Sequence, residues 1–307
     1  MESAQENNSC RLCGGSDQQI IRDNLMSKYG DSFSLKKCSN CSYVSTNPVP
    51  SDQLLRRYYD RNYWQSGRLK KSVALKTFYK WRMAGIVSYI EKNSKSGSKI
   101  LDWGCGDGSF VKLLRSHGYE CYGLDAYAAE PDVPYIINAT IEKPGFPEDF
   151  FDIVTCFHVL EHLKGPKQSI ANAYKILKTN GMMIVEVPNF DSLGSRIFRN
   201  RWQPLQIPTH ISHFTPETFH KLSQSVGQDQ IVKTEFFSHR ISPSALVLSV
   251  FPSLSPKRIR EKYEGRFPLT FGVTYFILQL LAYPFAIFGS LIRHGEIVRI
   301  YVRKSAR

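Results

Sequence analysis

Four cysteines near the start of the chain have the spacing of a metal site. They form two Cys-x-x-Cys pairs, Cys10 with Cys13 and Cys38 with Cys41, separated by 24 residues. Each pair can present two thiolates from one tight turn, and two such turns complete a tetrahedral sulfur site suited to zinc. Because four sulfurs close the coordination sphere, the pattern predicts a structural zinc. Unrelated free thiols or a redox pair are the alternatives.

A glycine-rich turn is the second chemical signal. The stretch KILDWGCGDGSF predicts an apolar strand, a turn and the start of a helix. Gly104, Gly106 and Gly108 allow a sharp turn and let a ligand lie against the backbone. Asp102 precedes the turn, and Asp125 follows the next predicted strand, where a carboxylate can accept hydrogen bonds from both hydroxyls of a ribose. The pattern predicts a nucleoside-containing cofactor.

The spacing of the glycines separates two classes of cofactor. GCGDG lacks the third glycine that dinucleotide-binding turns place two residues beyond the second. Asp102, immediately before the turn, would repel a pyrophosphate but can bind an ammonium group. The aminoacyl end of S-adenosylmethionine carries such a group, so the turn favours this cofactor over NAD.

Four blocks occur in order along the chain: ILDWGCGDG, YGLD, FPEDFFDIVTCFHVLEHL and ILKTNGMMIVEVPN. Over roughly 99–237 the sequence resembles the class I S-adenosylmethionine-dependent methyltransferases. The likeness extends to a subgroup with an N-terminal zinc ribbon and a PxHxxHFTPETF segment, here Pro208 to Phe219. The resemblance implies an α/β fold with a Rossmann-like, seven-stranded, mostly parallel sheet. We expect a zinc ribbon (1–48), connecting helices (49–98), the core (99–240), a basic and apolar helical insertion (241–295) and the last strand of the core (296–307).

The resemblance also implies which residues bind the cofactor. It assigns the turn to the methionine moiety, Asp125 to the ribose and the stretch after the third strand to the adenine. Many relatives have an acidic residue in that stretch, and Asn138-Ala139-Thr140 has none. The cofactor-binding residues that we predict are Asp102, Gly104, Cys105, Gly106, Asp125, Ala139, Thr140, Phe157 and His158.

Histidines supply the candidates for proton transfer. Methyl transfer to oxygen or nitrogen needs in-line alignment and a way to lose a proton, and histidine is the natural base at neutral pH. His158, His162, His210 and His213 are expected near the cleft. We predict that these four include the catalytic residues.

The HVLEHL stretch permits other interpretations. Ubiquinone-biosynthesis O-methyltransferases have a similar ExxEH pattern that binds a divalent cation, but His158 replaces the first acid here. Magnesium prefers oxygen ligands, so this replacement argues against a magnesium site. Glu161 and His162 could instead cap and pack the following helix. Beyond this stretch, we predict that Trp202 and His213 contact the substrate, with core packing and helix capping as the alternatives.

Residues 51–92 predict two helices, the second over roughly 68–92. Basic residues crowd this region, together with the aromatic side chains of Tyr58, Tyr59, Tyr63 and Trp64. Such a mixture can bind single-stranded nucleic acid, but no known nucleic-acid motif accompanies it. We therefore favour a solvated basic face over an aromatic core. Tyr63 and Trp64 could line a covered active site.

Residues 267–292 form an uncharged apolar run flanked by basic residues. The run is long enough to span a bilayer, but a single span would separate the last strand, near 296–303, from its sheet. Pro284 interrupts the run, so we expect two short helices or one kinked helix that enters one leaflet. The basic flanks within 257–293 would contact anionic headgroups. A buried hairpin over the active site or a dimer interface is the alternative.

Composition limits the function classes. The 307 residues carry a net charge of +13, which favours an anionic partner. The polar first residues predict no secretory signal, and seven cysteines with two Cys-x-x-Cys pairs suit a reducing compartment. We expect a cytoplasmic enzyme, peripheral on a membrane if 257–293 binds one. Its acceptor would be a small molecule, a sugar or a lipid-linked compound. A nucleic-acid methyltransferase and a non-catalytic binding protein are the alternatives.

Overall fold

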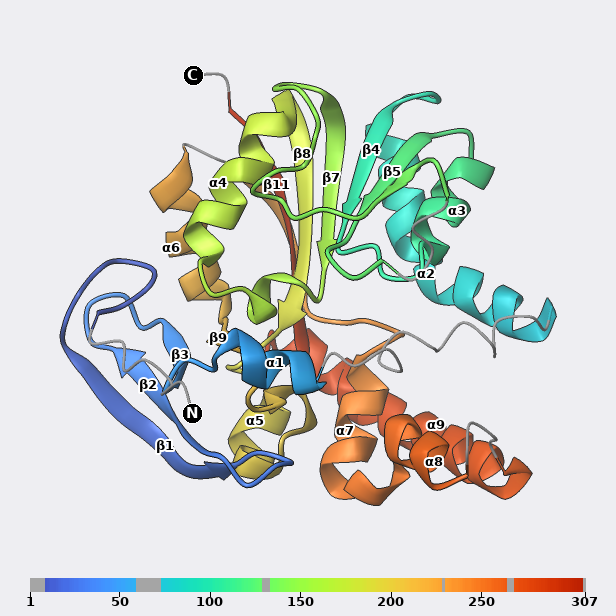
Figure 1. Ribbon diagram of the computed structural model, residues 1–307. Coiled ribbons are helices and arrows are strands. Elements are labelled where there is room, and N and C mark those ends of the chain that lie inside the picture. The colour runs from blue at the N-terminus through green and yellow to red at the C-terminus, as the bar shows by residue number, and fades with distance from the viewer. Residues whose placement is uncertain (1–8, 59–72, 129–132, 228–229, 264–267, 306–307) are drawn as a thin grey trace.

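The computed structural model describes residues 9–58, 73–128, 133–227, 230–263 and 268–305. Two sheets organise this part of the chain (Figure 1). Part of the region predicted to form connecting helices, residues 59–72 with Tyr59, Tyr63 and Trp64, lies outside the described ranges.

The core sheet has seven strands, as predicted. Its order is β10-β11-β8-β7-β4-β5-β6, and the pairs among β8, β7, β4, β5 and β6 are parallel. The last strand, β11, inserts antiparallel between β8 and β10. The strands are β4 (Lys99–Trp103), β5 (Glu120–Leu124), β6 (Ile136–Ile137), β7 (Phe151–Phe157), β8 (Leu177–Pro188), β10 (Gln230–Glu235) and β11 (Ile297–Arg303).

Helices cover both faces of this sheet (Figure 1). On one face lie α2 (Val73–Asn93) and α3 (Ser109–Ser116), and on the other α4 (Pro166–Ile176) and α6 (Pro216–Val226). The central strands are therefore buried on both sides, which explains apolar runs such as MMIV in β8. Two hydrophobic clusters result, one on each face.

The smaller sheet contains the N-terminal strands and one strand from the core. Its order is β1-β2-β3-β9, with all pairs antiparallel. The strands are β1 (Gln18–Met26), β2 (Ser32–Cys38), β3 (Val44–Asn47) and β9 (Ser212–His213). We call residues 9–47 the ribbon. The ribbon strands lie within the predicted 1–48 module, but the strand from the PxHxxHF segment is a finding that the sequence did not predict.

The remaining helices gather near the carboxyl ends of the parallel strands (Figure 1). They are α1 (Asp52–Tyr58), α5 (Leu193–Phe198), α7 (Ser242–Val250), α8 (Pro256–Lys262) and α9 (Leu269–Leu291), with 3₁₀ turns η2 (Leu160–His162), η3 (Arg199–Arg201), η4 (Gln203–Leu205) and η5 (Pro252–Leu254). The predicted helical insertion between 241 and 295 thus contains α7, α8 and α9.

The apolar run forms one helix, α9, with Pro284 inside it. Of the two expected arrangements, two short helices or one kinked helix, the structure therefore excludes the first. A proline deprives the carbonyl four residues earlier of its helical partner. Leu280 is 52% exposed, so water can reach this part of the helix. Among the described residues, only Thr270–Leu291 is long and apolar enough to cross a membrane, and 11% of its most apolar window is buried.

Candidate functional site

A cavity of about 1060 Å³ lies at the carboxyl ends of β4, β5 and β7. Ligands of open α/β sheets bind at this edge. The glycine turn and residues after β5, β6 and β7 line one part of the cavity. Residues from η4, α7 and the segment between η4 and β9 line another part. The two parts give room for a cofactor and a second molecule.

The glycine turn brings the backbone to the cavity wall. Gly104 has a φ of +81°, and a Cβ on it would lie 2.0 Å from Cγ2 of Val159. Any other residue would therefore be both strained and blocked at this position. The backbone N–H of Gly106 donates to Oδ2 of Asp125 over 2.9 Å, which ties the turn to the end of β5.

Asp102 is a buried carboxyl group at the end of β4. It is 4% exposed, and its Oδ1 accepts a hydrogen bond from Oγ1 of Thr155 over 2.8 Å. Burial raises the pKa of Asp102 to about 7, although the bond from Thr155 opposes this shift. A cation bound in the cavity would favour the ionised form of this carboxyl group.

Asp125 links the turn to the segment after β5. Its two carboxylate oxygens accept from the backbone N–H groups of Gly106 and Tyr127, the second over 2.8 Å. These bonds oppose the burial that raises the pKa of Asp125. The carboxylate is thus held in one orientation at the wall of the cavity.

The other predicted cofactor residues also line the cavity. Ala139 and Thr140 follow β6, and Phe157 ends β7 with its ring 5.5 Å from that of Phe110. Cys105 lines the cavity as well, but its sulfur lies beside Gly123, where an added Cβ would approach Sγ to 2.6 Å. Cys105 therefore contributes packing toward β5, and burial raises its thiol pKa.

His158 lines the cavity but cannot act as the predicted base. Its Nδ1 lies 3.1 Å from Oε1 of Glu161, and its Nε2 lies 2.9 Å from Oε1 of Glu186. Burial alone would lower the pKa of His158, but the two carboxylates raise it to about 9. At neutral pH both ring nitrogens are therefore protonated and committed to carboxylates, and the ring has no lone pair to offer.

We expect His158 to stabilise the fold, and we expect this contribution to disappear as the pH becomes alkaline. A pKa that is raised in the folded state stabilises the fold fully below the unfolded pKa, and this stabilisation is lost as pH rises through about 9. Asparagine tolerates the positive φ of this position, 57°. The His158→Asn variant should lose about 3 kcal/mol relative to wild type at mildly acidic pH, where the histidine is charged in both states. Denaturant unfolding should show the two proteins converging in strongly alkaline buffer, and a difference independent of pH would contradict the assignment.

His162 and His210 come together on the cavity wall. Their ring centroids lie 4.6 Å apart. Nδ1 of His162 donates to the carbonyl of Thr209 over 2.9 Å, and Nδ1 of His210 donates to that of Pro204 over 2.7 Å. Burial lowers the pKa of both rings, most strongly that of His210. Both imidazoles are therefore neutral, and each carries its proton on Nδ1.

Glu161, His162 and His210 form a group that could hold a metal ion. Their ligand atoms lie within 4.8 Å of one another, and Oε2 of Glu161 is buried without a hydrogen-bond partner. Two imidazoles and one carboxylate suit zinc or a similar transition metal better than magnesium.

His213 and Trp202 do not line the cavity, contrary to our prediction of substrate contact. Because β9 pairs with β3, the His213 side chain is directed to the ribbon, where Nε2 lies 3.0 Å from Oγ1 of Thr46. Burial lowers the pKa of His213 to about 3, and because its Nε2 faces Thr46 in the ribbon, the ring is not placed to take a proton in the cavity. Nε1 of Trp202 donates to Oε2 of Glu296 over 2.6 Å inside the core.

Further charged residues that the sequence analysis did not single out for the site line the cavity, among them Arg82, Arg240 and Glu142. Arg82, from α2, and Arg240, just before α7, both line it without an ion pair to any described carboxylate. Nε of Arg82 is buried without a partner, and burial together with Arg240 lowers the pKa of Arg82 to about 10. Glu142 lies two residues after Thr140. The prediction of a solvated basic face was wrong for Arg82, because basic residues on a helix give no signal of which one faces inward.

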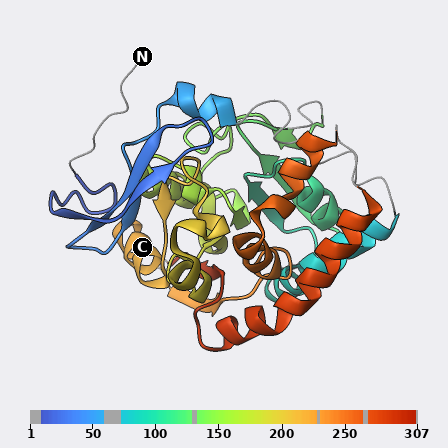
Figure 2. The same ribbon diagram turned by 90° about the horizontal axis from the view of Figure 1, so that it is seen from below.

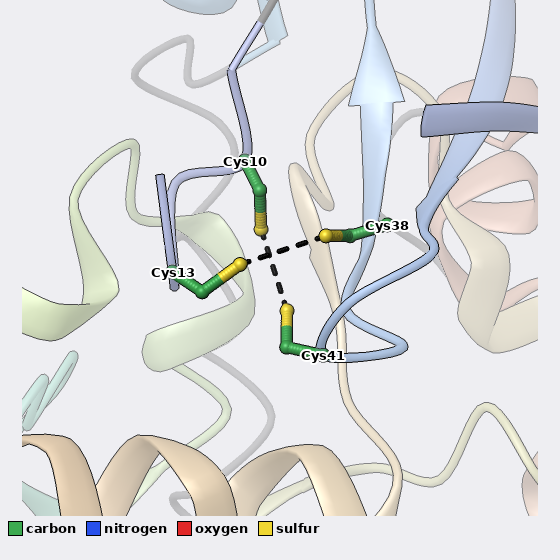
Figure 3. Close-up of side chains that lie close together, drawn as sticks. All are labelled: Cys10, Cys13, Cys38 and Cys41. Carbon is green, nitrogen blue, oxygen red and sulfur yellow. Dashed lines mark hydrogen bonds between the residues drawn. The ribbon is translucent and has the colours of Figure 1, made fainter. Parts of the chain in front are cut away.

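The four cysteines of the ribbon converge (Figure 3). Sγ of Cys10 lies 3.5 Å from that of Cys41, and Sγ of Cys13 lies 3.6 Å from that of Cys38. A tetrahedral zinc with bonds of about 2.3 Å requires sulfur separations of about 3.8 Å. The sulfurs therefore fit a single metal ion, and no disulfide joins any of the four.

Comparisons with known proteins agree with this architecture. Residues 75–256, more than half of the chain, match the family described as a methyltransferase domain, so the chain belongs to this family. It is 26% identical over 157 residues to the mitochondrial ubiquinone biosynthesis O-methyltransferase of Schizosaccharomyces pombe, covering 47% of this chain and 55% of that protein. It is 35% identical over 113 residues to the ubiquinone biosynthesis O-methyltransferase of Rickettsia conorii, covering 33% and 39%. The chain thus spans about half or less of the length of these curated relatives.

Among solved structures, a SAM-dependent methyltransferase from Archaeoglobus fulgidus is similar over 80% of this chain and 100% of that one, with 21% identity and a TM-score of 0.48.

Proposed function

We propose that the protein transfers a methyl group from S-adenosylmethionine to an oxygen of a small-molecule acceptor. The observation that carries this proposal is the pair of oriented carboxylates, Asp102 and Asp125, on either side of the glycine turn in one cavity. Membership of the methyltransferase domain family supports the reaction class. The ubiquinone biosynthesis O-methyltransferases among the relatives favour a hydroxyl group on a quinone precursor as the acceptor.

Each part of the cofactor has a matching group in the cavity. Asp102 would accept from the ammonium group of the methionine moiety, and Arg82 would donate to its carboxylate. Asp125 would accept from the ribose hydroxyls. Glu142 would accept from the adenine amino group and supply the acid that Asn138-Ala139-Thr140 lacks.

The acceptor would lie between the glycine turn and the histidines. As its oxygen attacks the methyl carbon, the carbon–sulfur bond breaks and S-adenosylhomocysteine is formed. The proton of the hydroxyl would pass to Nε2 of His210, since Nδ1 already donates to Pro204. His162 is the second candidate for this role. If Glu161, His162 and His210 held a metal ion, it would occupy the Nε2 atoms of both rings and act as a Lewis acid on the acceptor oxygen in place of the histidine base.

Calorimetric titration of S-adenosylhomocysteine into the full chain tests the cofactor assignment. We expect one binding site per chain. A catechol such as 3,4-dihydroxybenzoate, incubated with tritium-labelled S-adenosylmethionine, then tests transfer to oxygen. Folded protein that binds no S-adenosylhomocysteine would overturn the proposed function, whereas binding without transfer to the catechol would reject only this acceptor.

We also propose that the four cysteines bind structural zinc. The ribbon contributes Leu25, Phe33, Leu35 and Val44 to a small hydrophobic cluster that it shares with Trp202 and Leu205, so a metal would supply much of its stability. The Cys38→Ser variant should lose its zinc, and its ribbon should become sensitive to protease. Metal analysis should find one zinc per chain fewer in Cys38→Ser than in wild type and in a Cys121→Ser control, since Cys121 lies in β5 outside the cluster. Full zinc content in the Cys38→Ser variant would contradict the assignment.

We further propose that α9 binds a membrane surface, which would suit a lipid-linked acceptor. Its large apolar side chains are exposed, among them Leu281 at 63%, Phe285 at 70% and Leu291 at 77%. Exposed basic side chains flank the helix: Arg258, Lys262 and Arg293. An apolar helix with cationic flanks matches an anionic bilayer surface.

The position of α9 supports a link to the cavity. It runs along the edge of the molecule (Figure 2) and packs against α7, where the hydroxyl groups of Tyr275 and Ser244 are 2.6 Å apart. On α7, Ser244, Ala245 and Leu248 line the cavity. One helix layer thus separates the exposed apolar surface from the proposed acceptor site.

Vesicle flotation tests membrane binding. Wild type should float with vesicles of phosphatidylcholine and phosphatidylglycerol, and a double variant with Leu281→Glu and Phe285→Glu should stay with the bulk fraction. Ile197→Glu is a matched control, because Ile197 is 67% exposed on α5. Equal recovery of wild type and the double variant in the vesicle fraction would remove the proposal.

A further inference from the structure

The segment that carries His210 is shared between the core and the ribbon. Directly after His210, β9 (Ser212–His213) pairs with β3 as the fourth strand of the ribbon sheet. The backbone N–H of Thr46, in β3, extends this pairing by donating to the carbonyl of Ile211 over 2.9 Å. The ribbon is therefore continuous with one wall of the cavity.

The Thr46 side chain strengthens this junction. Its hydroxyl group donates to the carbonyl of His210 over 2.7 Å and lies 3.0 Å from Nε2 of His213. A hydroxyl has one proton, and here the carbonyl takes it, so Nε2–H of His213 must be the donor in the second bond. Thr46 is 1% exposed, so water cannot readily replace either bond.

The opposite edge of the segment is bound to the core. The N–H of Ile211 donates to the carbonyl of Glu161 over 2.8 Å. The N–H of His210 donates to Gln206, and its ring donates to Pro204. With the bond from Thr46, both backbone groups and the ring of His210 are fixed, and the ribbon supplies one of these three contacts.

We infer that Thr46 is a positioning residue for His210 and that the ribbon is a structural part of the acceptor site. This inference rests on the proposed function, in which His210 faces the acceptor. Thr46 touches neither cofactor nor acceptor and acts through the backbone of His210. If the ribbon only recruited a partner, changes in the ribbon would leave the cavity unaltered. The role inferred here requires such changes to alter the cavity.

The chain offers a matched set of variants. Thr46→Val removes the hydroxyl group at nearly constant shape, and Thr46→Ser keeps it. Ser34→Ala is the control, since Oγ of Ser34 donates to the carbonyl of Asn47 inside the ribbon. Ser212→Ala removes the contact between the hydroxyl groups of Tyr43 and Ser212 from the core side. Ser212→Ala changes the junction from outside the ribbon, so it tests the junction even if the Thr46→Val variant loses the zinc of the ribbon.

Two measurements on metal-loaded full-length protein do not depend on turnover. In Thr46→Val, amide hydrogen exchange over 206–214 should accelerate about tenfold or more, because the junction opens more often. Nitrogen-15 spectra of the histidine rings should show wild-type His213 with its proton on Nε2, and Thr46→Val should change this signal. Thr46→Ser and Ser34→Ala should resemble wild type in both, and Ser212→Ala should resemble Thr46→Val in the exchange experiment.

Cofactor binding and turnover complete the test. The affinity for S-adenosylhomocysteine should stay within about twofold in all four variants, since none of the junction's hydrogen bonds involves the glycine turn or Asp125. Catechol methylation should fall about tenfold or more in Thr46→Val and recover in Thr46→Ser. Wild-type exchange and ring signals in both Thr46→Val and Ser212→Ala would overturn the inference. If wild type binds no S-adenosylhomocysteine, the proposed function is wrong. The exchange data test only the junction, so the two failures can be told apart.

Discussion

The Asp125→Ala variant should bind S-adenosylhomocysteine at least about a hundredfold more weakly than wild type, because two charge-assisted hydrogen bonds of about 1.5 kcal/mol each would be lost. Asp125 also holds the glycine turn through the N–H of Gly106. Its removal would therefore loosen the surface against which the cofactor lies. Calorimetry on the zinc-loaded variant measures the loss directly.

The Asp125→Asn variant separates the two contributions. An amide oxygen can still accept from Gly106 or Tyr127, so the turn should persist, but the amide lacks the charge and the full set of acceptors for a ribose diol. We expect an affinity between those of wild type and Asp125→Ala. Affinity equal to wild type in both variants would show that the ribose does not lie at Asp125, and the cofactor assignment would then need another site.

The cofactor half of the site could be predicted from sequence because its residues are local. Asp102 and the glycines lie within one strand–turn–helix unit, and Asp125 follows the next strand. In a parallel sheet, strand ends meet at one edge, so sequence order alone brings these groups together. The seven-stranded sheet was implied by the resemblance to class I methyltransferases, and the apolar pattern of β11 agrees with it.

The acceptor half could not be predicted, because partners distant in sequence decide it. His158 looked like a base, but Glu186, 28 residues later, and Arg299 beyond it lock the ring as a cation. The sequence gives no reason to distinguish His213 from His210. In the structure, the pairing of β9 with β3 directs His213 to the ribbon. No periodicity signals a two-residue strand, and none identifies which arginine of a basic helix faces inward.

The Glu186→Gln variant should lose about 3 to 5 kcal/mol of unfolding free energy at neutral pH, because it removes the carboxylate shared by two buried cations and leaves each cation with a single carboxylate partner. Glu186 is 3% exposed. It accepts from Nε of Arg299 over 2.8 Å, from Nη2 of the same guanidinium, and from His158. Burial alone would raise the pKa of Glu186, but Arg299 and His158 lower it well below the usual range. The carboxylate is therefore the one anion that contacts both cations, while Glu161 is the second partner of His158 and Glu235 the second partner of Arg299.

A partly exposed ion pair between β8 and β7 provides the control. Lys178 and Asp152 lie 2.8 Å apart, with side chains 39% and 35% exposed. Solvent screens such a pair, so Lys178→Ala should change the unfolding free energy by no more than about 1 kcal/mol. Denaturant unfolding of both variants at one pH makes the comparison. Similar losses of unfolding free energy in the two variants would mean that Glu186 contributes no more than a solvent-screened ion pair. A large loss confined to Glu186→Gln would establish that the ion network behind the cavity holds β7, β8 and β11 together, and with them the wall on which His158 lies.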